Sequence, residues 1–289
     1  MLILALDTTS EVGGVGIFRD CECLAHVANN GPANGYSVTL FSMLDQAIEE
    51  AKARHGVPVR GLAELGLIAV AAGPGSFTGI RVGLAAAQGW AKAFGLPVRG
   101  VSVLEALVEA ARAPTEWAAA ILDARRGEFY VGLFRRVVSG TRVAGPEQPQ
   151  APPLHEDQPY YVPAGEGWLL RPEELGALLA RRLPDGAETT CVIREHDRAA
   201  LALRENLSSS FQWQAITGTL VEPVARLGLR DYGNPQAAGN LDAYYIRRPD
   251  AALPGDLKNR NSKFETRNSK LENREWKLEN RNWKMENGD

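Results

Sequence analysis

The residues best suited to chemistry in this 289-residue chain lie in a glycine-rich turn, Gly73-Pro-Gly-Ser-Phe-Thr-Gly-Ile-Arg81. Backbone amides of such a turn, at the start of a helix, can bind a phosphate group. The spacing matches neither G-x-x-x-x-G-K-[ST], because the turn has no lysine, nor G-x-G-x-x-G, because Thr78 replaces the third glycine. The turn therefore indicates either a phosphate contact of another kind or plain turn chemistry, for which glycine supplies positive φ.

A second polar turn, Asp7-Thr-Thr-Ser10, ends an apolar run and precedes the glycine-rich segment Gly13–Gly16. This arrangement resembles the first phosphate-binding hairpin of the actin, sugar-kinase and Hsp70 superfamily, in which the aspartate orients metal and phosphates. The resemblance makes Asp7, Thr8, Thr9 and Ser10 candidate nucleotide-binding residues. The same side chains also close β-turns well, so both interpretations stay open.

Other catalytic patterns are missing from the sequence. The histidines His26, His55, His155 and His196 form no H-E-x-x-H or H-x-x-x-H pair, and no G-x-S-x-G motif occurs. The charged cluster within Asp123–Glu128 is more typical of a solvated hairpin turn than of an active site. We therefore predict neither catalytic residues nor metal ligands.

The elements that position these turns follow from periodicity and from start and stop signals. Three strands in an antiparallel meander, a helix and then alternating strands and helices predict a mixed sheet flanked by helices. The expected strands are Leu2–Asp7, Gly14–Arg19, Cys23–Ala28, Leu67–Ala72, Val98–Val101, Trp117–Asp123, Glu128–Phe134 and Thr190–Arg194. The expected helices are Tyr36–Arg54, Phe77–Phe94, Val103–Ala113, Pro172–Arg182, Arg198–Asn206 and Ile216–Leu229.

Two of these helices have unusual faces. In Phe77–Phe94, small residues recur at every fourth position from Gly79 to Ala91, and the two interior glycines of this row cost about 2 kcal/mol against alanine. Close packing of a strand or of a second subunit has to offset that cost, and we predict an assembly surface. The helix Tyr36–Arg54 is apolar over a wider arc than one sheet contact needs, so part of it is also expected to meet a partner.

Composition narrows the class of protein. A hydrophobic content of 45% and a net charge of −3 are typical of a soluble globular protein. Such a charge does not attract a protein strongly to nucleic acid or to a membrane surface. No apolar run approaches the length of a membrane span, and no basic leader precedes the first strand. Cys21, Cys23 and Cys191 fit neither a zinc site nor a disulfide framework, which predicts a cytoplasmic location.

Two segments differ from the rest of the chain. Ser139–Pro163 is proline-rich and polar, which predicts a long loop between lobes. From Arg260 to Asn287 one heptad repeats four times, with one reliably apolar position per heptad where a coiled-coil seam needs two. Its composition predicts disorder or a frayed helix, either a functionless extension or a segment that binds a partner.

Five motifs together are similar to the TsaB family, formerly called YeaZ. They are Leu6-Asp-Thr-Thr-Ser10, Gly73-Pro-Gly-Ser-Phe-Thr-Gly-Ile-Arg81, Gly100-Val-Ser-Val-Leu-Glu-Ala, Leu122-Asp-Ala-Arg-Arg-Gly-Glu-Phe-Tyr130 and Leu241-Asp-Ala-Tyr-Tyr-Ile-Arg-Arg-Pro249. The resemblance implies an actin-like (Hsp70-like, ribonuclease H-like) α/β fold with a mixed sheet and a reduced second lobe. We accordingly predict an N-terminal lobe at 1–136, a smaller lobe at 137–253 and a tail at 254–289.

The resemblance also implies a function. TsaB proteins support the related subunit TsaD, together with the ATPase TsaE, in transferring a threonylcarbamoyl group to the adenosine beside the anticodon of ANN-decoding tRNAs. TsaD holds its metal through a histidine pair, which this chain lacks. A subunit of this kind has no cofactor of its own, leaves ATP and the divalent metal to its partners, contacts tRNA through the complex, and pairs with TsaD or with itself.

In this family, two helices of the N-terminal lobe mediate both kinds of pairing. Carried over to this chain, they are Tyr36–Arg54 and Thr78–Phe94, and Gly83→Leu is expected to abolish partner binding while leaving the chain folded. Tyr36 replaces a histidine of many relatives, so no role is carried over to it. The implied interface residues are Phe41, Leu44, Ile48, Gly79, Val82, Gly83, Ala86, Ala87 and Trp90.

Two other classes of protein remain open at this stage. The Asp7–Ser10 turn favours an actin-like ATP-dependent kinase or nucleotide-binding enzyme, but no second phosphate motif accompanies it. A metallopeptidase is disfavoured by the missing histidine pairs.

Overall fold

The first sheet is built around β1 (Leu2–Asp7), whose apolar residues are buried on both of its faces. Its order is β3-β2-β1-β4-β5, with the meander strands antiparallel and the other two strands parallel to β1. The remaining strands of this sheet are β2 (Gly14–Arg19), β3 (Glu22–Ala28), β4 (Leu67–Gly73) and β5 (Val98–Ser102). This computed structural model describes residues 1–29, 31, 35–55, 61–137, 159–206, 211–232 and 246.

The second sheet repeats this topology. Its order is β11-β10-β6-β7-β8, with β9 also paired to β7, so that β6 has antiparallel strands on one side and parallel strands on the other, as β1 does. Its strands are β6 (Trp117–Asp123), β7 (Phe129–Val137), β8 (Tyr160–Pro163), β9 (Trp168–Leu170), β10 (Thr189–Arg194) and β11 (Gln212–Ile216). We call the two sheets, each with its outer helices, the first and second lobes.

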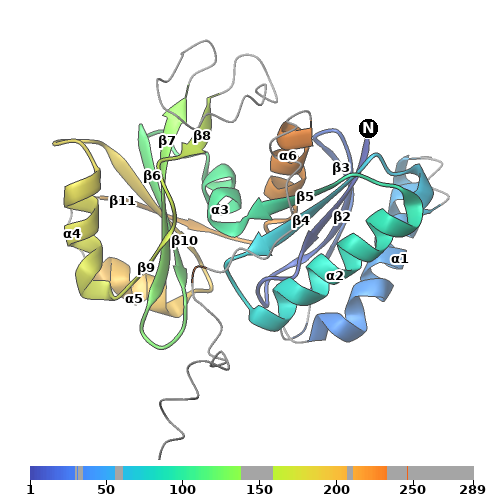
Figure 1. The fold of residues 1–289 in the computed structure, drawn as a ribbon, viewed down its shortest axis with the longest axis horizontal. Coiled ribbons are helices and arrows are strands. Elements are labelled where there is room, and N and C mark those ends of the chain that lie inside the picture. Colours follow the sequence, from blue (N-terminus) through green and yellow to red (C-terminus); the bar gives the residue numbers. More distant parts are fainter. Residues whose placement is uncertain are drawn as a thin grey trace, which may run out of the picture. The chain divides into compact units, whose positions relative to one another are not determined.

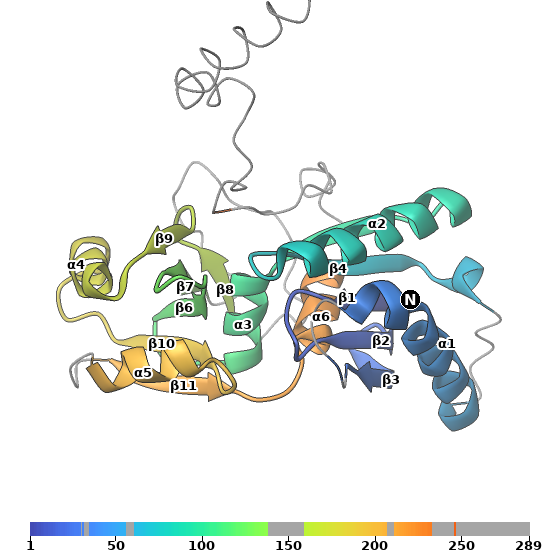
Figure 2. The ribbon, with the colours of Figure 1, turned by 90° about the horizontal axis from the view of Figure 1, so that it is seen from below.

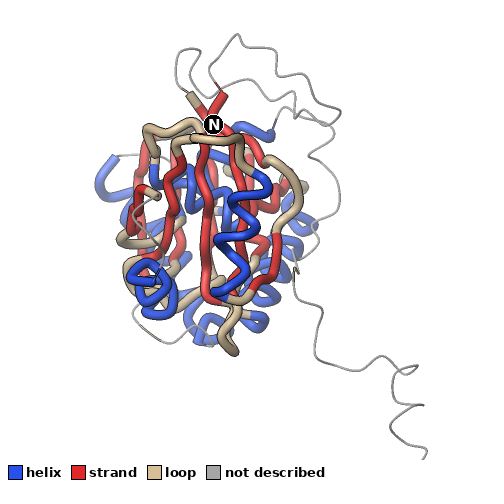
Figure 3. The backbone as a smooth tube through the Cα atoms, turned by 90° about the vertical axis from the view of Figure 1, so that its left-hand side faces the viewer, coloured by secondary structure: helices blue, strands red, loops and turns tan. Residues whose placement is uncertain are grey.

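Helices separate and cover the two sheets, as Figures 1 and 2 show. Two helices cover the outer face of the first sheet, two lie between the sheets and two cover the outer face of the second. In this order they are α1 (Tyr36–His55) and α2 (Phe77–Phe94), α3 (Val103–Ala111) and α6 (Val221–Tyr232), and α4 (Pro172–Arg182) and α5 (Arg198–Asn206). A short 3₁₀ turn, η2 (Leu62–Glu64), precedes β4. Figure 3 shows strands lying side by side among these helices.

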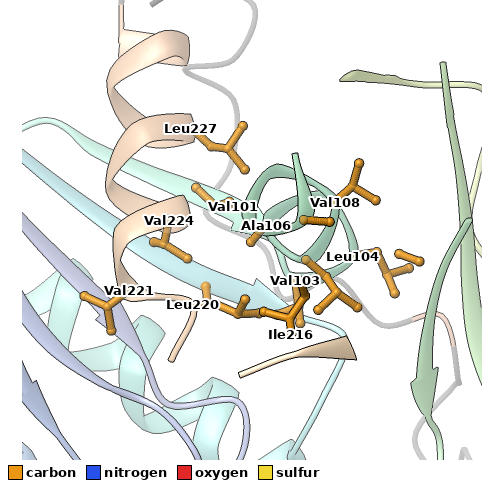
Figure 4. Close-up of a cluster of buried hydrophobic side chains, with 14 of the residues drawn as sticks. Val101, Val103, Leu104, Ala106, Val108, Ile216, Leu220, Val221, Val224 and Leu227 are labelled. Carbon is orange, nitrogen blue, oxygen red and sulfur yellow. The ribbon is translucent and has the colours of Figure 1, made fainter. Parts of the chain in front are cut away.

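The core between the sheets is shared by both lobes (Figure 4). The helix α6, which follows the last strand of the second sheet, packs against β1 and β4 of the first. Its Gly228 allows this approach, because a Cβ there would lie 2.5 Å from the Cβ of Ala69. The helix α3, which follows the last strand of the first sheet, packs against β6 and β8 of the second. The last strand of each sheet is therefore followed by a helix that covers the other sheet.

The predicted class, an α/β fold with mixed sheets flanked by helices, is confirmed. The helix predicted at Ile216–Leu229 is observed as α6, which begins five residues later at Val221; β9 was not predicted, and neither was β11, which ends at Ile216. The strand β11 forms because its backbone pairs with β10, a neighbour that local periodicity does not reveal. The change of sheet, between β5 and β6, comes earlier than the predicted division at residue 136.

Two other predicted segments lie partly or wholly outside the residues that the structure describes. The segment Tyr160–Pro163, predicted to end a loop, forms β8, whereas 139–158 and the tail at 254–289 lie outside the described residues. Among the helices of the described part, none has the length and apolar character needed to cross a membrane.

Candidate partner surface and interlobe site

Exposed apolar side chains gather where α1 lies beside α2. Val38 is 82% exposed and Phe41 60%, and their spacing places both on one face of α1. The ring of Phe41 meets that of Trp90 edge to face, with the ring centroids 5.7 Å apart. Val82 and Ala86, half-buried, lie two turns and one turn before Trp90, respectively, on the same face of α2. We call Val38, Phe41, Val82 and Ala86 the α1–α2 surface; Trp90, whose ring contacts Phe41, is itself buried.

Other predicted interface residues face the protein interior. Leu44 and Ile48 are buried in the core between the sheet and its outer helices. Gly79, Gly83 and Ala87, the small-residue row of α2, are buried as well. In the isolated chain these five residues pack within the protein and expose little surface, so their place in an interface stays a prediction.

The small-residue row packs against the end of β1 in the same chain. A Cβ on Gly79 would lie 1.9 Å from the carbonyl oxygen of Thr8, and one on Gly83 would lie 2.4 Å from Thr8 Oγ1. The hydroxyl of Thr8 donates to the carbonyl oxygen of Gly79 over 2.7 Å. The expectation for Gly83→Leu is corrected accordingly, because a leucine would displace Thr8 and disturb the fold before any partner is involved.

The glycine-rich turn seats the start of α2 on the Asp7–Ser10 turn. The amide of Ser76 donates to the carbonyl oxygen of Thr9 over 2.7 Å, and Ser76 Oγ caps the helix by accepting from the amide of Gly79. The polar groups of the turn thus serve contacts within the chain. Beyond the turn, the guanidinium of Arg81 stacks over the ring of Phe77, 3.7 Å from its centroid.

Asp7 is fully buried at the end of β1 and faces a cation from the second lobe. Its Oδ1 accepts from the amide and the hydroxyl of Thr9, over 3.0 and 2.7 Å. Its Oδ2 lies 3.8 Å from Nη1 of Arg194, the last residue of β10, which is 1% exposed. Nη2 of Arg194 donates to the carbonyl oxygens of Val12 and Gly218, over 2.7 and 2.9 Å. We call Asp7, Val12, Arg194 and Gly218 the interlobe site.

Two electrostatic effects act in opposite directions on the pKa of Arg194. Burial lowers the pKa of Arg194, and the neighbouring negative charge of Asp7 acts in the other direction. Tyr36 lies nearby and donates its hydroxyl to the carbonyl oxygen of Ser10 over 3.0 Å. Burial raises the pKa of Tyr36 well above its ordinary value, with the charge of Asp7 adding to the effect. Tyr36 is therefore neutral and holds the Asp7–Ser10 turn from α1.

The sequence identified Asp7, Thr8, Thr9 and Ser10 but missed the residues that engage them. Arg194 and Tyr36 lie far from the turn in the chain, and neither carries a local pattern that names its partner. The charged hairpin after β6 is structural in its described contacts: Asp123 Oδ1 accepts from the amide of Arg125, and the amide of Asp123 donates to Asp197. Within the described ranges, no group of three or more His, Cys, Asp or Glu side chains is arranged to hold a metal ion.

Comparison with known proteins places this fold in a family. Residues 33–152 match the family model "TsaD: tRNA N6-adenosine threonylcarbamoyltransferase". The chain is 31% identical over 135 residues to the tRNA threonylcarbamoyladenosine biosynthesis protein TsaB of Bacillus subtilis, which covers 47% of this chain and 56% of that protein. It is 30% identical over 195 residues to TsaB of Escherichia coli, covering 64% of this chain and 80% of that protein.

A solved structure is similar over a longer range. YeaZ from Pseudomonas aeruginosa matches with a TM-score of 0.60 and 22% identity, covering 84% of this chain and 99% of that one, which shows the shared fold. The matched region spans about half of the Bacillus subtilis relative but four fifths of the Escherichia coli one. By fold and by sequence, the chain belongs to the TsaB family.

Proposed function

We propose that this chain is a non-catalytic subunit that supports threonylcarbamoyl transfer to tRNA. The observation that carries the proposal is membership of the TsaB family, whose Escherichia coli and Bacillus subtilis members are named for tRNA threonylcarbamoyladenosine biosynthesis. The acceptor is the adenosine beside the anticodon of ANN-decoding tRNAs, and the chain acts as scaffold and activator. The state of the Asp7–Ser10 turn supports this role, because its polar groups are engaged within the chain.

The partner in this proposal is a TsaD-family protein, and the α1–α2 surface is the contact. The match of residues 33–152 to the TsaD family model includes both α1 and α2. A partner of related fold can present an equivalent pair of helices, so two similar apolar faces can pack together. The exposure of Val38 and Phe41 supports this, because monomers seldom leave clustered large apolar side chains in water.

The other components follow from the same proposal. ATP and a divalent metal are used by the partner subunits, TsaE joins the assembly, and tRNA is reached through the complex. In the absence of TsaD the α1–α2 surface pairs two copies of this chain, and the whole assembly works in the cytoplasm. The alternative, an ATP-dependent kinase or nucleotide enzyme, receives no support from Asp7, which is paired with Arg194.

Size-exclusion chromatography of this chain mixed with a bacterial TsaD tests the proposal. We expect a complex containing both chains that elutes ahead of either protein alone. Separate elution of the two proteins at micromolar concentration would contradict it.

A further inference from the structure

The carboxyl ends of β1 and β10 meet between the lobes, at a place where α/β proteins commonly bind ligands. Strands of open α/β sheets end at the edge where ligands are usually held. Here β1 ends in Asp7 and β10 ends in Arg194, and both side chains are buried. The two residues come from different sheets, so their contact spans the boundary between the lobes.

Arg194 connects three separate segments through one guanidinium group. Nη2 donates to Val12 in the β1–β2 turn of the first lobe and to Gly218 in the turn between β11 and α6. Nη1 lies at ion-pair distance from Asp7. The turn that contains Gly218 leads into α6, which covers the first sheet. Arg194 thus touches both the edge of the first lobe and the segment that crosses to it.

The polar groups around Asp7 are already hydrogen-bonded to other partners, so the group that faces the Asp7 carboxylate is the guanidinium of Arg194. Thr9 occupies Asp7 Oδ1, Gly79 accepts from the Thr8 hydroxyl, and Ser76 donates to the Thr9 carbonyl oxygen. Among the described residues, Asp7 Oδ2 has no hydrogen-bond partner, nor do Nε and Nη1 of Arg194, and Nη1 and Oδ2 face each other. A buried charge is costly unless it is paired, so each of these two groups depends on the other across the boundary.

We propose that Arg194 is an interlobe clamp: its guanidinium fills the site at the carboxyl ends of β1 and β10 and fixes the two lobes against each other. The clamp takes the place that a phosphate-bearing ligand and its metal would need. The isolated chain therefore holds its lobes together without a nucleotide between them. This proposal rests on contacts within the chain and stands apart from the function proposed above.

Hydrogen exchange measured by mass spectrometry on the full chain tests the clamp. In Arg194→Met, peptides covering 8–14 and 217–220 should exchange about tenfold faster than in the wild type, because two carbonyl bonds and the ion pair are lost. Peptides from the interior strands β4 and β7 should keep their protection. Unchanged exchange at 8–14 and 217–220 would overturn the proposal, and so would an equal increase throughout both lobes, which would make Arg194 an ordinary core residue.

A double variant keeps the test decisive if Arg194→Met does not fold. Asp7→Asn combined with Arg194→Met leaves no buried unpaired charge and should fold more readily. It should show the same local increase at 8–14 and 217–220, and protection there equal to the wild type would overturn the clamp.

The filled site makes a second, independent prediction. Millimolar ATP with magnesium should leave the exchange of peptide 8–14 unchanged in the wild-type chain. Protection of that peptide by ATP and magnesium would show that the site admits a nucleotide and would overturn the proposal.

Discussion

At the scale of single residues, the glycines of α2 have very different surroundings. Gly79 and Gly83 face Thr8 at distances that leave no room for a Cβ, whereas a Cβ on Gly89 would meet nothing within 4 Å. All three lie in the same helix. The row of small residues in α2 therefore indicates close packing, and its packing partner is Thr8, directly after β1.

Gly79→Ala is expected to destabilise the chain and Gly89→Ala to stabilise it. Overpacking against the Thr8 backbone outweighs the gain in helix propensity, giving a net loss of about 2 kcal/mol in the free energy of unfolding. Gly89→Ala, the matched control, gains about 1 kcal/mol because only propensity changes. Urea denaturation of both variants measures the difference, and equal midpoints would contradict the packing described for Gly79.

Cys191 should be chemically inert in the folded chain. It is fully buried in β10, and burial raises its pKa from 9.0 to about 12. At pH 8 iodoacetamide should modify the exposed Cys23 and spare Cys191, whereas in urea it should modify both. Modification of Cys191 at the rate of Cys23 in native buffer would show that β10 is accessible.

The same burial predicts how stability depends on alkaline pH. The folded-state pKa of Cys191 is raised, so its contribution is fully present below pH 9.0 and is lost as pH rises toward about 12. The free energy of unfolding of Cys191→Ala should therefore fall less steeply over this range than that of the wild type. Parallel curves for the two proteins would contradict the raised pKa.

At the scale of elements, α1 buries one stripe against the first sheet and leaves another in water. Leu40, Leu44, Ala47 and Ala51 belong to the buried stripe, and Phe41 belongs to the exposed one. The proposed partner contact therefore rests mainly on Val38 and Phe41, which lie outside the buried stripe. This separation allows binding and folding to be tested independently.

Phe41→Glu should abolish binding to TsaD and leave stability nearly unchanged. A charge would be buried in an apolar contact, which costs several kcal/mol unless it is paired, while the exposed ring contributes little to the fold. Gln46→Glu adds the same charge at an exposed position on another face of α1 and should bind normally. Titration calorimetry with TsaD compares the two variants, and equal affinities would remove Phe41 from the interface.

Local sequence patterns predicted most helices and strands, because the hydrophobic periodicity of each element is visible within its own residues. The strand β11 was missed because it depends on pairing with β10. The Asp7–Ser10 turn was recognised from its side chains, but Arg194 was not, since a single arginine at a strand end does not reveal which carboxylate it faces. The buried small-residue row shows the same limit: its spacing predicts close packing and leaves the packing partner open.

At the scale of the whole molecule, α3 and α6 join the two lobes through one shared core. Val224 on α6 is fully buried there, with residues of both sheets in the same cluster. The lobes are also connected by the interlobe site. The described part of the chain is therefore expected to unfold as one cooperative unit.

Val224→Ala should weaken both sheets equally. Removing its two methyl groups costs about 2 kcal/mol, and the slowest-exchanging amides of β4 and β10 should lose the same protection because both strands contribute side chains to the core that contains Val224. Glu222→Ala, at an exposed position on the same helix, should change neither. Native-state hydrogen exchange reports both strands, and a loss confined to β4 would show that the lobes unfold separately.

The central claim is that this chain activates threonylcarbamoyl transfer without catalysing it, and one assay tests it most directly. Transfer to an ANN-decoding tRNA is measured with TsaD, TsaE, ATP, magnesium and the threonylcarbamoyl donor, with and without this chain. We predict strong stimulation by the wild type and by Gln46→Glu, little by Phe41→Glu, and no transfer by the chain when TsaD is omitted. Equal transfer by TsaD and TsaE with and without the chain would contradict the account.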